Sequence, residues 1–294
     1  LKQGIKMDLA PLLHALMIII GFGIVFLIIM GLEHYYLIKQ KQEAYDLKET
    51  IANIFSAVLY KTMDGIYLIF FLGIVAAWIK SNGLGWNVPI TWWSILLIFI
   101  AQDFFFYFAH LFAHKFRIGW VTHKIHHSSK HFNFGVALRQ SLLAPIPLFG
   151  IFSIVWLPFV FMGVDIKVVA FIYELNLFYQ FFIHTKTIDR LPKWYEAVFN
   201  TPAHHRVHHG CAESQIDTNF GGVFILWDRL FGTFKDEAQV KPIVFGVKSR
   251  PITTNNVVVM IFEELIDLIK TTWKAKDLRV LFRHPDWKSE KSEK

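Results

Sequence analysis

The chain has 294 residues, of which 54% are hydrophobic and only 18% charged, with a formal net charge of +7. Ordinary soluble domains carry about 25% charged residues, so this composition indicates a membrane protein and excludes a conventional soluble domain. The basic balance fits attraction to anionic lipid headgroups. No basic stripe on a soluble domain accompanies it, so we expect no nucleic-acid partner. Cys211, the single cysteine, excludes an internal disulfide framework and fits a reducing compartment.

Five apolar stretches are candidate membrane helices, since about 20 apolar residues in a helix cross the roughly 30 Å of hydrocarbon. In chain order they are residues 9–32, 51–79, 88–109, 140–164 and 168–183. We expect the first to be a retained helix, because it is too long for a signal peptide and lacks a cleavage site. Lys61 and Asp64 interrupt the second, so its spanning part is expected at 65–79. The three prolines of 140–164 predict a kinked or re-entrant pair of segments.

The expected fold is all-α, an integral membrane bundle of four to five membrane helices that carries a helical cap. An excess of Lys and Arg in short loops marks the cytoplasmic side of a membrane protein. Residues 110–140 contain five Lys or Arg and no acidic residue, whereas the opposite loops offer only Lys80 and Lys167. We therefore expect a multi-pass protein whose cap lies on the cytoplasmic face.

Three regions follow one another along the chain, without a linker or an internal repeat between them. We expect membrane helices and a connector in 1–87, a catalytic domain in 88–235 and a cytoplasmic tail in 236–294. The tail contains one predicted amphipathic helix, 257–270. This helix either lies on the membrane interface or packs on the cap, and its sequence leaves both possibilities open.

Eleven of the 14 histidines lie between residues 110 and 209, in clusters spaced as metal ligands would be. Residues three and four apart share one helix face, so such pairs aim two imidazoles at one point. His184, at the end of the last apolar stretch, is either a helix cap or a further ligand, and we favour the ligand. His204 directly precedes a complete HxxHH motif and is the most dispensable member. The ten candidate metal ligands are His110, His114, His123, His126, His127, His184, His204, His205, His208 and His209.

Two polar stripes run along predicted membrane helices toward these histidines. Asp103 lies seven residues before His110, and Asn176 and Gln180 precede His184 at intervals of four, so each set follows one helix face. A carboxylate in an apolar helix is costly unless it is paired, and metal-bound imidazoles commonly donate their free N–H to a carboxylate. We therefore expect Asp103 to support a metal-bound histidine, with a purely structural contact as the alternative. Asn176 and Gln180 are expected in the same catalytic site.

The number of histidines favours a pair of metal ions, because four ligands already close a tetrahedral zinc site. Soluble di-iron sites in helical bundles rely on carboxylates, and these clusters contain none. A site at the membrane face, beside apolar helices, suits dioxygen activation and attack on a lipid C–H bond, for which iron is the reasonable redox metal. Spacing alone leaves zinc and copper open. An exposed, pH-sensing histidine patch is the alternative that needs no metal.

At these residues the chain resembles the fatty acid hydroxylase/sterol desaturase superfamily of membrane di-iron oxygenases. The resemblance covers residues 90–235 and rests on the order HxxxH, HxxHH, HxxHH. Within the superfamily the chain is most similar to the branch that cleaves ether lipids (alkylglycerols). The stretches that carry this similarity are 126–129, 137–141, 176–185, 200–210 and 221–234.

The resemblance implies a site with two Fe ions and identifies the residues that bind them. His184 and His204 would be additional or supporting ligands. Tetrahydrobiopterin is the electron donor that the resemblance implies, and an electron-donor protein is the alternative. The eight implied iron ligands are His110, His114, His123, His126, His127, His205, His208 and His209.

These observations predict a membrane-bound di-iron monooxygenase whose partners are dioxygen and a long-chain lipid. Hydroxylation beside an ether oxygen would give a hemiacetal that collapses to an aldehyde and a glycerol derivative. A second hypothesis is a sterol or fatty acyl hydroxylase or desaturase that uses an electron-transfer protein. A membrane metal transporter is a third, which we disfavour because transporter ligands lie near the bilayer midplane within broken helices.

Overall fold

The computed structural model describes residues 10–147, 149 and 155–287, with the side chains of residue 21 and of residues 23 onward. These ranges contain no β-strand, only isolated bridges between Phe199 and Phe224 and between Gly210 and Phe245, which confirms the predicted all-α class. The helices are α1 (Ala10–Lys39), α2 (Leu47–Ile66), η1 (Tyr67–Leu72), α3 (Gly73–Ser81), α4 (Trp92–Lys115), α5 (Arg117–His127), α6 (Phe134–Ala137), α7 (Leu157–Phe161), α8 (Ile166–Ile183), α9 (Lys193–Val198), α10 (Pro202–His208), α11 (Leu226–Phe231), η3 (Glu237–Gln239), α12 (Val257–Ala275) and η4 (Leu278–Phe282).

The chain divides into two compact units, one up to Ala44 and one from Tyr45 onward, and we describe each by itself. In the first unit, α1 is a single helix of 30 residues with Lys39 in its last turn, where a cation interacts favourably with the helix dipole. The first predicted membrane stretch, 9–32, coincides with this helix from Ala10 onward. Residue 9 lies outside the described residues.

Three helical segments among the described residues are long and apolar enough to cross a membrane: Leu47–Ser81, Trp92–Lys115 and Ile166–Ile183. The first joins α2, the π-helical η1 and α3 without a break, so Lys61 and Asp64 interrupt the apolar pattern but not the helix, and the spanning part at 65–79 stays a prediction. Lys61 lies 3.5 Å from Asp64 and 2.5 Å from Glu174 of α8. The helix tolerates these charges because they pair with one another.

The predicted pair of segments in 140–164 does not form a long helix in its described part. Residues 142–147 are turns, and α7 is a helix of five residues with Pro158 in its first turn. Residues 148 and 150–154 lie outside the description. The described part of the chain therefore contains fewer candidate spans than the four to five that the sequence predicts.

Local sequence fixes where the helices that carry the histidines begin and end. Thr91 and Ser94 cap the start of α4 reciprocally, each side chain accepting a hydrogen bond from the other's backbone N–H, which satisfies donors that the first turn leaves free. The chain is extended at Phe116 between α4 and α5. This one extended residue turns the chain sharply, so that α4 and α5 pack against each other.

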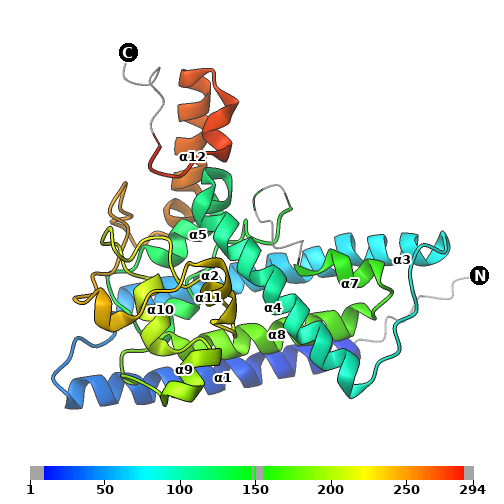
Figure 1. Ribbon diagram of the computed structural model, residues 1–294, viewed down its shortest axis with the longest axis horizontal. Helices are drawn as coiled ribbons and strands as arrows, with labels where there is room; N and C mark the ends of the chain where they lie inside the picture. The colour runs from blue at the N-terminus through cyan, green and yellow to red at the C-terminus, as the bar shows by residue number, and fades with distance from the viewer. Residues whose placement is uncertain (1–9, 148, 150–154, 288–294) are drawn as a thin grey trace, which may run out of the picture. The chain divides into compact units, whose positions relative to one another are not determined.

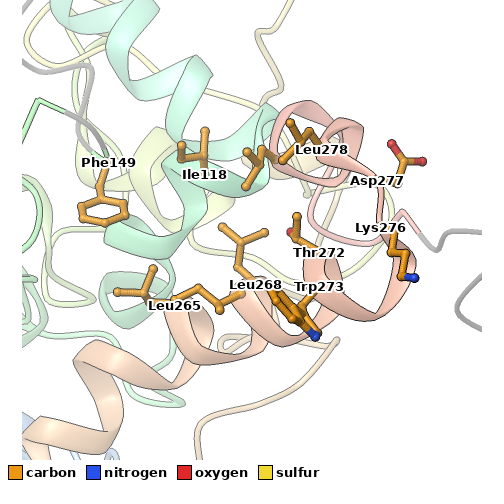
Figure 2. Close-up of a pocket in the computed structure, with 11 residues that line it drawn as sticks. Ile118, Phe149, Leu265, Leu268, Thr272, Trp273, Lys276, Asp277 and Leu278 are labelled. Atoms are coloured by element: carbon orange, nitrogen blue, oxygen red, sulfur yellow. The ribbon is translucent and has the colours of Figure 1, made fainter.

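Two apolar cores organise the second unit (Figure 1). One lies among the candidate membrane helices and buries Phe106 of α4, Phe159 of α7 and Ile172 of α8. The other buries Ile125 of α5 against Met260 of α12. The predicted tail helix is thus confirmed and longer than expected, and it packs on α5. An apolar groove of about 730 Å³ lies between α12, η4 and the start of α5 (Figure 2).

Buried charges join α12 to α5. The Glu264 carboxylate accepts hydrogen bonds from Arg117 Nε and Lys124 Nζ, each at 3.0 Å, and all three side chains are 2% exposed. Arg250 donates a further one at 3.0 Å. Arg117 and Lys124 also contact Asp267 and Glu263, but these carboxylates are 41% and 35% exposed, so Glu264 is their buried counter-charge.

Replacing Glu264 by alanine is expected to lower the free energy of unfolding by about 3 kcal/mol, because buried Arg117 and Lys124 then keep only the partly exposed carboxylates of Asp267 and Glu263. Glu213→Ala is the control, since Glu213 is 90% exposed and pairs only with exposed Lys248; it should change stability by less than about 1 kcal/mol. Unfolding of both variants in detergent micelles measures the difference. Equal losses would show that the buried network is not a main contact of the cap.

Candidate metal centre

The structure brings nine of the ten candidate histidines together at one end of the membrane helices. They come from the last two turns of α4, from α5, from the residue that ends α8, and from α10 with the residue after it. They form two groups, and within each group the potential ligand nitrogens lie within 4.8 Å of one another. The first group is His110, His114, His123, His127 and His208, and the second is His126, His184, His205 and His209.

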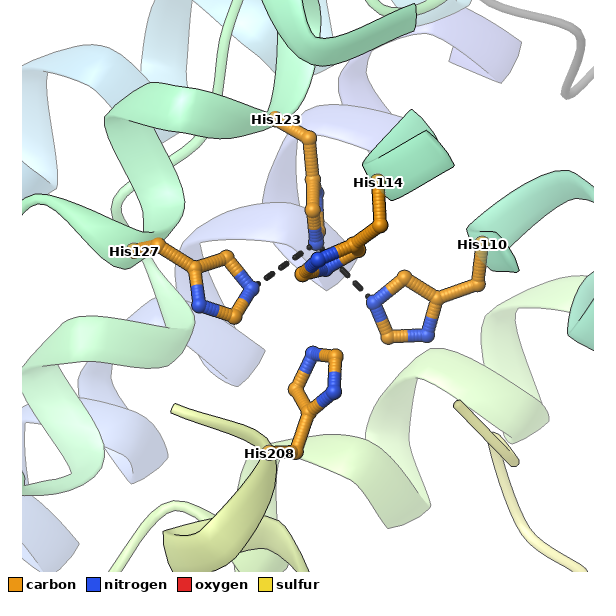
Figure 3. Close-up of side chains that lie close together, drawn as sticks. All are labelled: His110, His114, His123, His127 and His208. Atoms are coloured by element: carbon orange, nitrogen blue, oxygen red, sulfur yellow. Dashed lines mark hydrogen bonds between the residues drawn. The ribbon is translucent and has the colours of Figure 1, made fainter. Parts of the chain in front are cut away.

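In the first group, five imidazoles from three helices point toward a common centre (Figure 3). His123 Nε2 lies 2.9 Å from His110 Nε2 and 3.1 Å from His127 Nε2. His208 enters from α10, opposite to His123, and its Nε2 has no hydrogen-bond partner. The same is true of His114 Nε2.

In the second group, the Nε2 atoms form a continuous row. His184 Nε2 lies 3.2 Å from His126 Nε2 and 2.9 Å from His205 Nε2, and His205 Nε2 lies 3.2 Å from His209 Nε2. His184 therefore joins the α10 histidines to the α5 histidine, as a ligand would, although it also ends α8.

The two groups adjoin each other. The rings of His127 and His209, one from each group, stack with centroids 4.3 Å apart and an interplanar angle of 17°. The rings of His205 and His208 stack at 5.1 Å. Two ions held by these groups would be neighbours.

Backbone carbonyls fix the orientation of three of the rings. The Nδ1 atoms of His110, His184 and His208 lie 2.8, 2.7 and 2.9 Å from the carbonyl oxygens of Phe220, Gln180 and Thr218. A carbonyl only accepts, so each Nδ1 carries the proton and each Nε2 of the neutral ring carries a lone pair. Hydrogen bonds of this kind orient metal-ligating histidines.

The donor set fits metal ions. Buried nitrogens without a partner are costly, and a cation at the centre of each group would satisfy the lone pairs directed at it. Two imidazole nitrogens that bind one ion at about 2.1 Å and at a right angle are about 3.0 Å apart, as in the contacts of 2.9–3.2 Å seen here. Both groups consist of imidazole alone, which suits iron, copper, nickel or zinc.

His204 is the candidate that the structure does not bring to either group. Its ring is buried and packs edge-on against Phe234, with centroids 5.4 Å apart, and neither ring nitrogen has a hydrogen-bond partner. The residue after it, His205, points into the second group from the same helix. Adjacent residues on a helix face different directions, which separates the two rings.

Asp103 contacts no histidine through a hydrogen bond among the described residues, so the expected support for an imidazole N–H is not seen. Its carboxylate instead accepts four other hydrogen bonds, all of 2.7–3.0 Å. It thereby attaches α4 to the loop whose Phe220 carbonyl orients His110. This is the purely structural contact that was the alternative role for Asp103. It affects the metal centre indirectly, through the loop whose Phe220 carbonyl orients His110. The four donors are the backbone N–H groups of Val223 and Phe224, the Trp227 indole and the Asn176 side chain.

Asn176 and Gln180 extend the network of Asp103 along α8. Gln180 donates from its side chain to Asn176 Oδ1 at 2.6 Å, and Asn176 donates to Asp103 at 2.7 Å. The histidine contact of Gln180 is made by its backbone oxygen and not by its side chain. The predicted stripe exists, but it binds the loop at Val223 and does not reach the histidines through its side chains.

Sequence reasoning missed the 217–228 loop as the support of the site. The Asp228 carboxylate accepts hydrogen bonds from the backbone N–H groups of Phe220 and Gly221, both at 2.7 Å. A Cβ at Gly222 would lie 2.7 Å from an Asp103 oxygen, so only glycine fits this close approach. In the sequence, the paired glycines Gly221 and Gly222 and the later Asp228 were the signal that could have identified this segment as the support of the site.

Comparisons with known proteins agree with this geometry. Residues 95–233 match the family model described as fatty acid hydroxylase. The alkylglycerol monooxygenase of Homo sapiens is 38% identical over 217 residues, which cover 69% of this chain and 44% of that protein. The alkylglycerol monooxygenase of Caenorhabditis elegans is 33% identical over 241 residues, which cover 81% of this chain and 46% of that protein.

A bacterial relative has another lipid in its name. The ornithine lipid hydroxylase of Rhizobium tropici is 26% identical over 165 residues, which cover 53% of this chain and 46% of that protein. The chain thus spans less than half the length of these curated relatives. No solved structure matches it.

Burial lowers the pKa of the histidines that lie outside the membrane-spanning helices, because a charged imidazole loses its hydration there. The pKa of His184 falls from 6.5 to about 4. Burial, reinforced by neighbouring imidazoles, holds the pKa values of His205, His208 and His209 well below 6.5. These rings are therefore neutral near physiological pH, which is the form that binds metal ions.

The free energy of unfolding of the metal-free protein is expected to fall as pH drops from about 6.5 to about 4. In this window the unfolded chain binds protons that the buried histidines refuse, so acid favours unfolding. Thermal unfolding in detergent micelles at several pH values measures the slope. His184→Gln should make it shallower, because it removes one of the rings whose pKa burial lowers. A stability independent of pH in this window would contradict the burial of neutral rings.

Proposed function

This chain belongs to the fatty acid hydroxylase family through residues 95–233, and from that premise we propose that it is a membrane-bound, iron-dependent monooxygenase of a lipid. The observation that carries the proposal is the pair of adjoining, buried histidine groups, which contain no carboxylate. Their size and their imidazole-only composition favour two ions with positions left open over a closed tetrahedral zinc site.

Iron bound by both groups would activate dioxygen and supply the oxidant that removes a hydrogen atom from the lipid. The chain itself orients the imidazole ligands and excludes water from the metal site. The carbonyls of Phe220, Gln180 and Thr218 hold three rings with their Nε2 lone pairs inward. No ring of the two groups is more than 8% exposed, so bulk water is kept from the place where the oxidant forms.

An alkylglycerol is the substrate that we propose, by analogy with the named relatives. Dioxygen, two electrons and two protons convert the CH₂ group beside the ether oxygen to a CHOH group and release one water. The resulting hemiacetal breaks its bond to the glycerol oxygen, which takes the hydroxyl proton, and leaves an aldehyde and free glycerol. Tetrahydrobiopterin is the proposed source of the two electrons.

The side of the membrane on which the metal centre lies is inferred from the distribution of Lys and Arg. The histidines lie at the ends of α4 and α8, next to residues 110–140 with their five Lys or Arg and no acidic residue. The bias of positive residues places such a loop on the cytoplasmic side of a multi-pass protein. We therefore assign the metal centre to the cytoplasmic face.

A sterol or fatty acyl hydroxylase or desaturase with an electron-transfer protein is the second candidate. The description of the family model and the ornithine lipid hydroxylase relative favour it. A metal transporter is not favoured, because the histidines lie at helix ends and not within broken helices at the middle of the spans.

Two adjacent histidines provide a matched test of the metal groups. His204 and His205 are each 1% exposed, but only His205 belongs to a group. We expect His205→Ala to lower the iron content of purified protein from two to about one per chain, because it weakens one group. His204→Ala should retain two. Metal analysis measures both, and the same iron content in the two variants would count against the proposed groups.

Reconstituted membranes decide between the substrates. With dioxygen and tetrahydrobiopterin, alkylglycerol should yield the long-chain aldehyde, whereas sterol and fatty acyl substrates should yield no hydroxylated product. His205→Ala should reduce aldehyde formation to background, and Glu213→Ala should not. Product only from a sterol or fatty acyl substrate with a reductase would support the second candidate instead.

A further inference from the structure

One side of α12 remains uncovered by the protein and is apolar. Val258, Ile266, Ile269 and Trp273 are 60%, 48%, 59% and 85% exposed. Their spacing of eight, three and four residues places them on one face of the helix. We propose that this face, together with η4, contacts a lipid bilayer at its headgroup boundary, as a fourth membrane-contact element beside the three candidate spans.

The core of the cap accounts for a different side of α12. Val257, Met260, Ile261, Glu264 and Leu268 are buried against α5. At 100° per residue, the charged residues Glu263, Asp267, Lys270 and Lys274 fall on a third side. The helix is therefore apolar over two of its three sides, and packing on α5 explains only one of them. A helix of a soluble protein has a single apolar stripe.

The groove beside α12 continues the apolar face. Leu265, Ile269 and Trp273 form one wall, Ile118 of α5 and Leu278 of η4 form the others, and the volume is about 730 Å³ (Figure 2). Leu278 and Phe282 of η4 are themselves 71% and 58% exposed. A groove of this size and composition is suited to an acyl chain.

The direction of α12 differs from that of two of the candidate spans. In Figure 1, α12 runs across the direction of α8 and of α2 with α3. A helix that crosses the direction of the spans lies along the membrane plane, which is the orientation of an interfacial helix.

The basic residues at the C-terminal end of α12 favour a lipid bilayer over a protein as the partner of its exposed apolar face. Lys270, Lys274, Lys276 and Arg279 lie within ten residues of one another. Asp277 is the single acidic residue in this stretch, and it binds Arg279 with a hydrogen bond of 2.8 Å. An apolar face bordered by Lys and Arg at its C-terminal end fits acyl chains below and anionic headgroups above. Trp273, half apolar and half polar, is typical of that boundary.

Site-directed spin labels in the 294-residue chain test the proposal. Cys211→Ser removes the single cysteine, and Ile269→Cys, Trp273→Cys and the matched control Lys270→Cys then carry one nitroxide each. The proteins are placed in nanodiscs of phosphatidylcholine and phosphatidylglycerol in equal parts. Metal content of each variant confirms that the fold is retained.

Power saturation with oxygen and with a water-soluble nickel chelate reports the surroundings of each label. Labels at 269 and 273 are expected to be more accessible to oxygen, at a depth of about 5–10 Å below the phosphates, and the label at 270 more accessible to nickel. Nickel-accessible labels at 269 and 273 would overturn the proposal. Labels shielded from both reagents would also overturn it, by showing a protein partner or a second copy on this face.

Quenching of tryptophan fluorescence by brominated phosphatidylcholine gives a measurement that needs no cysteine. Trp273→Phe should remove a larger share of the quenchable emission than Trp194→Phe, because Trp194 is similarly exposed at 72% but lies on α9. Equal shares would contradict a bilayer contact at α12. Neither measurement depends on turnover, so a failure here leaves the proposed chemistry untouched.

Discussion

Nine buried imidazoles packed against one another are the constraint on which the rest of the structure depends. Their ring nitrogens face each other and not water, and carbonyls of Phe220, Gln180 and Thr218 direct three Nε2 lone pairs inward. Such crowding is unfavourable unless a cation binds the lone pairs. The rings come from α4, α5, α8 and α10, so the same contacts that create the metal groups also join the membrane helices to the cap.

Sequence spacing predicted the histidines well, because ligands three or four residues apart must share a helix face wherever the helix goes. It could not separate His204 from His205, since neighbours in one motif differ only in the direction of their side chains. It also misjudged the partner of Asp103. The donors to that carboxylate include Val223 and Trp227, more than a hundred residues later, and periodicity within one helix holds no information about such a contact.

For the membrane helices too, the sequence predicted some features and could not predict others. Apolar length found α4 and α8, and the helix Leu47–Ser81 is continuous through Lys61 and Asp64, which lie 3.5 Å apart. For α12 the sequence predicted an amphipathic helix but not its orientation. The structure uses one apolar side against α5 and exposes a second one, which is the side that we propose contacts the bilayer.

X-ray absorption at the iron edge of the purified protein tests the central claim most directly, because it reports which atoms surround the metal. An imidazole-only site predicts a shell of nitrogen and oxygen near 2.1 Å, about the distance of metal–imidazole bonds, with strong outer scattering from several imidazoles at each iron. Sulfur scattering, from the Cys211 thiolate or a methionine thioether, or a spectrum with little imidazole scattering would contradict it.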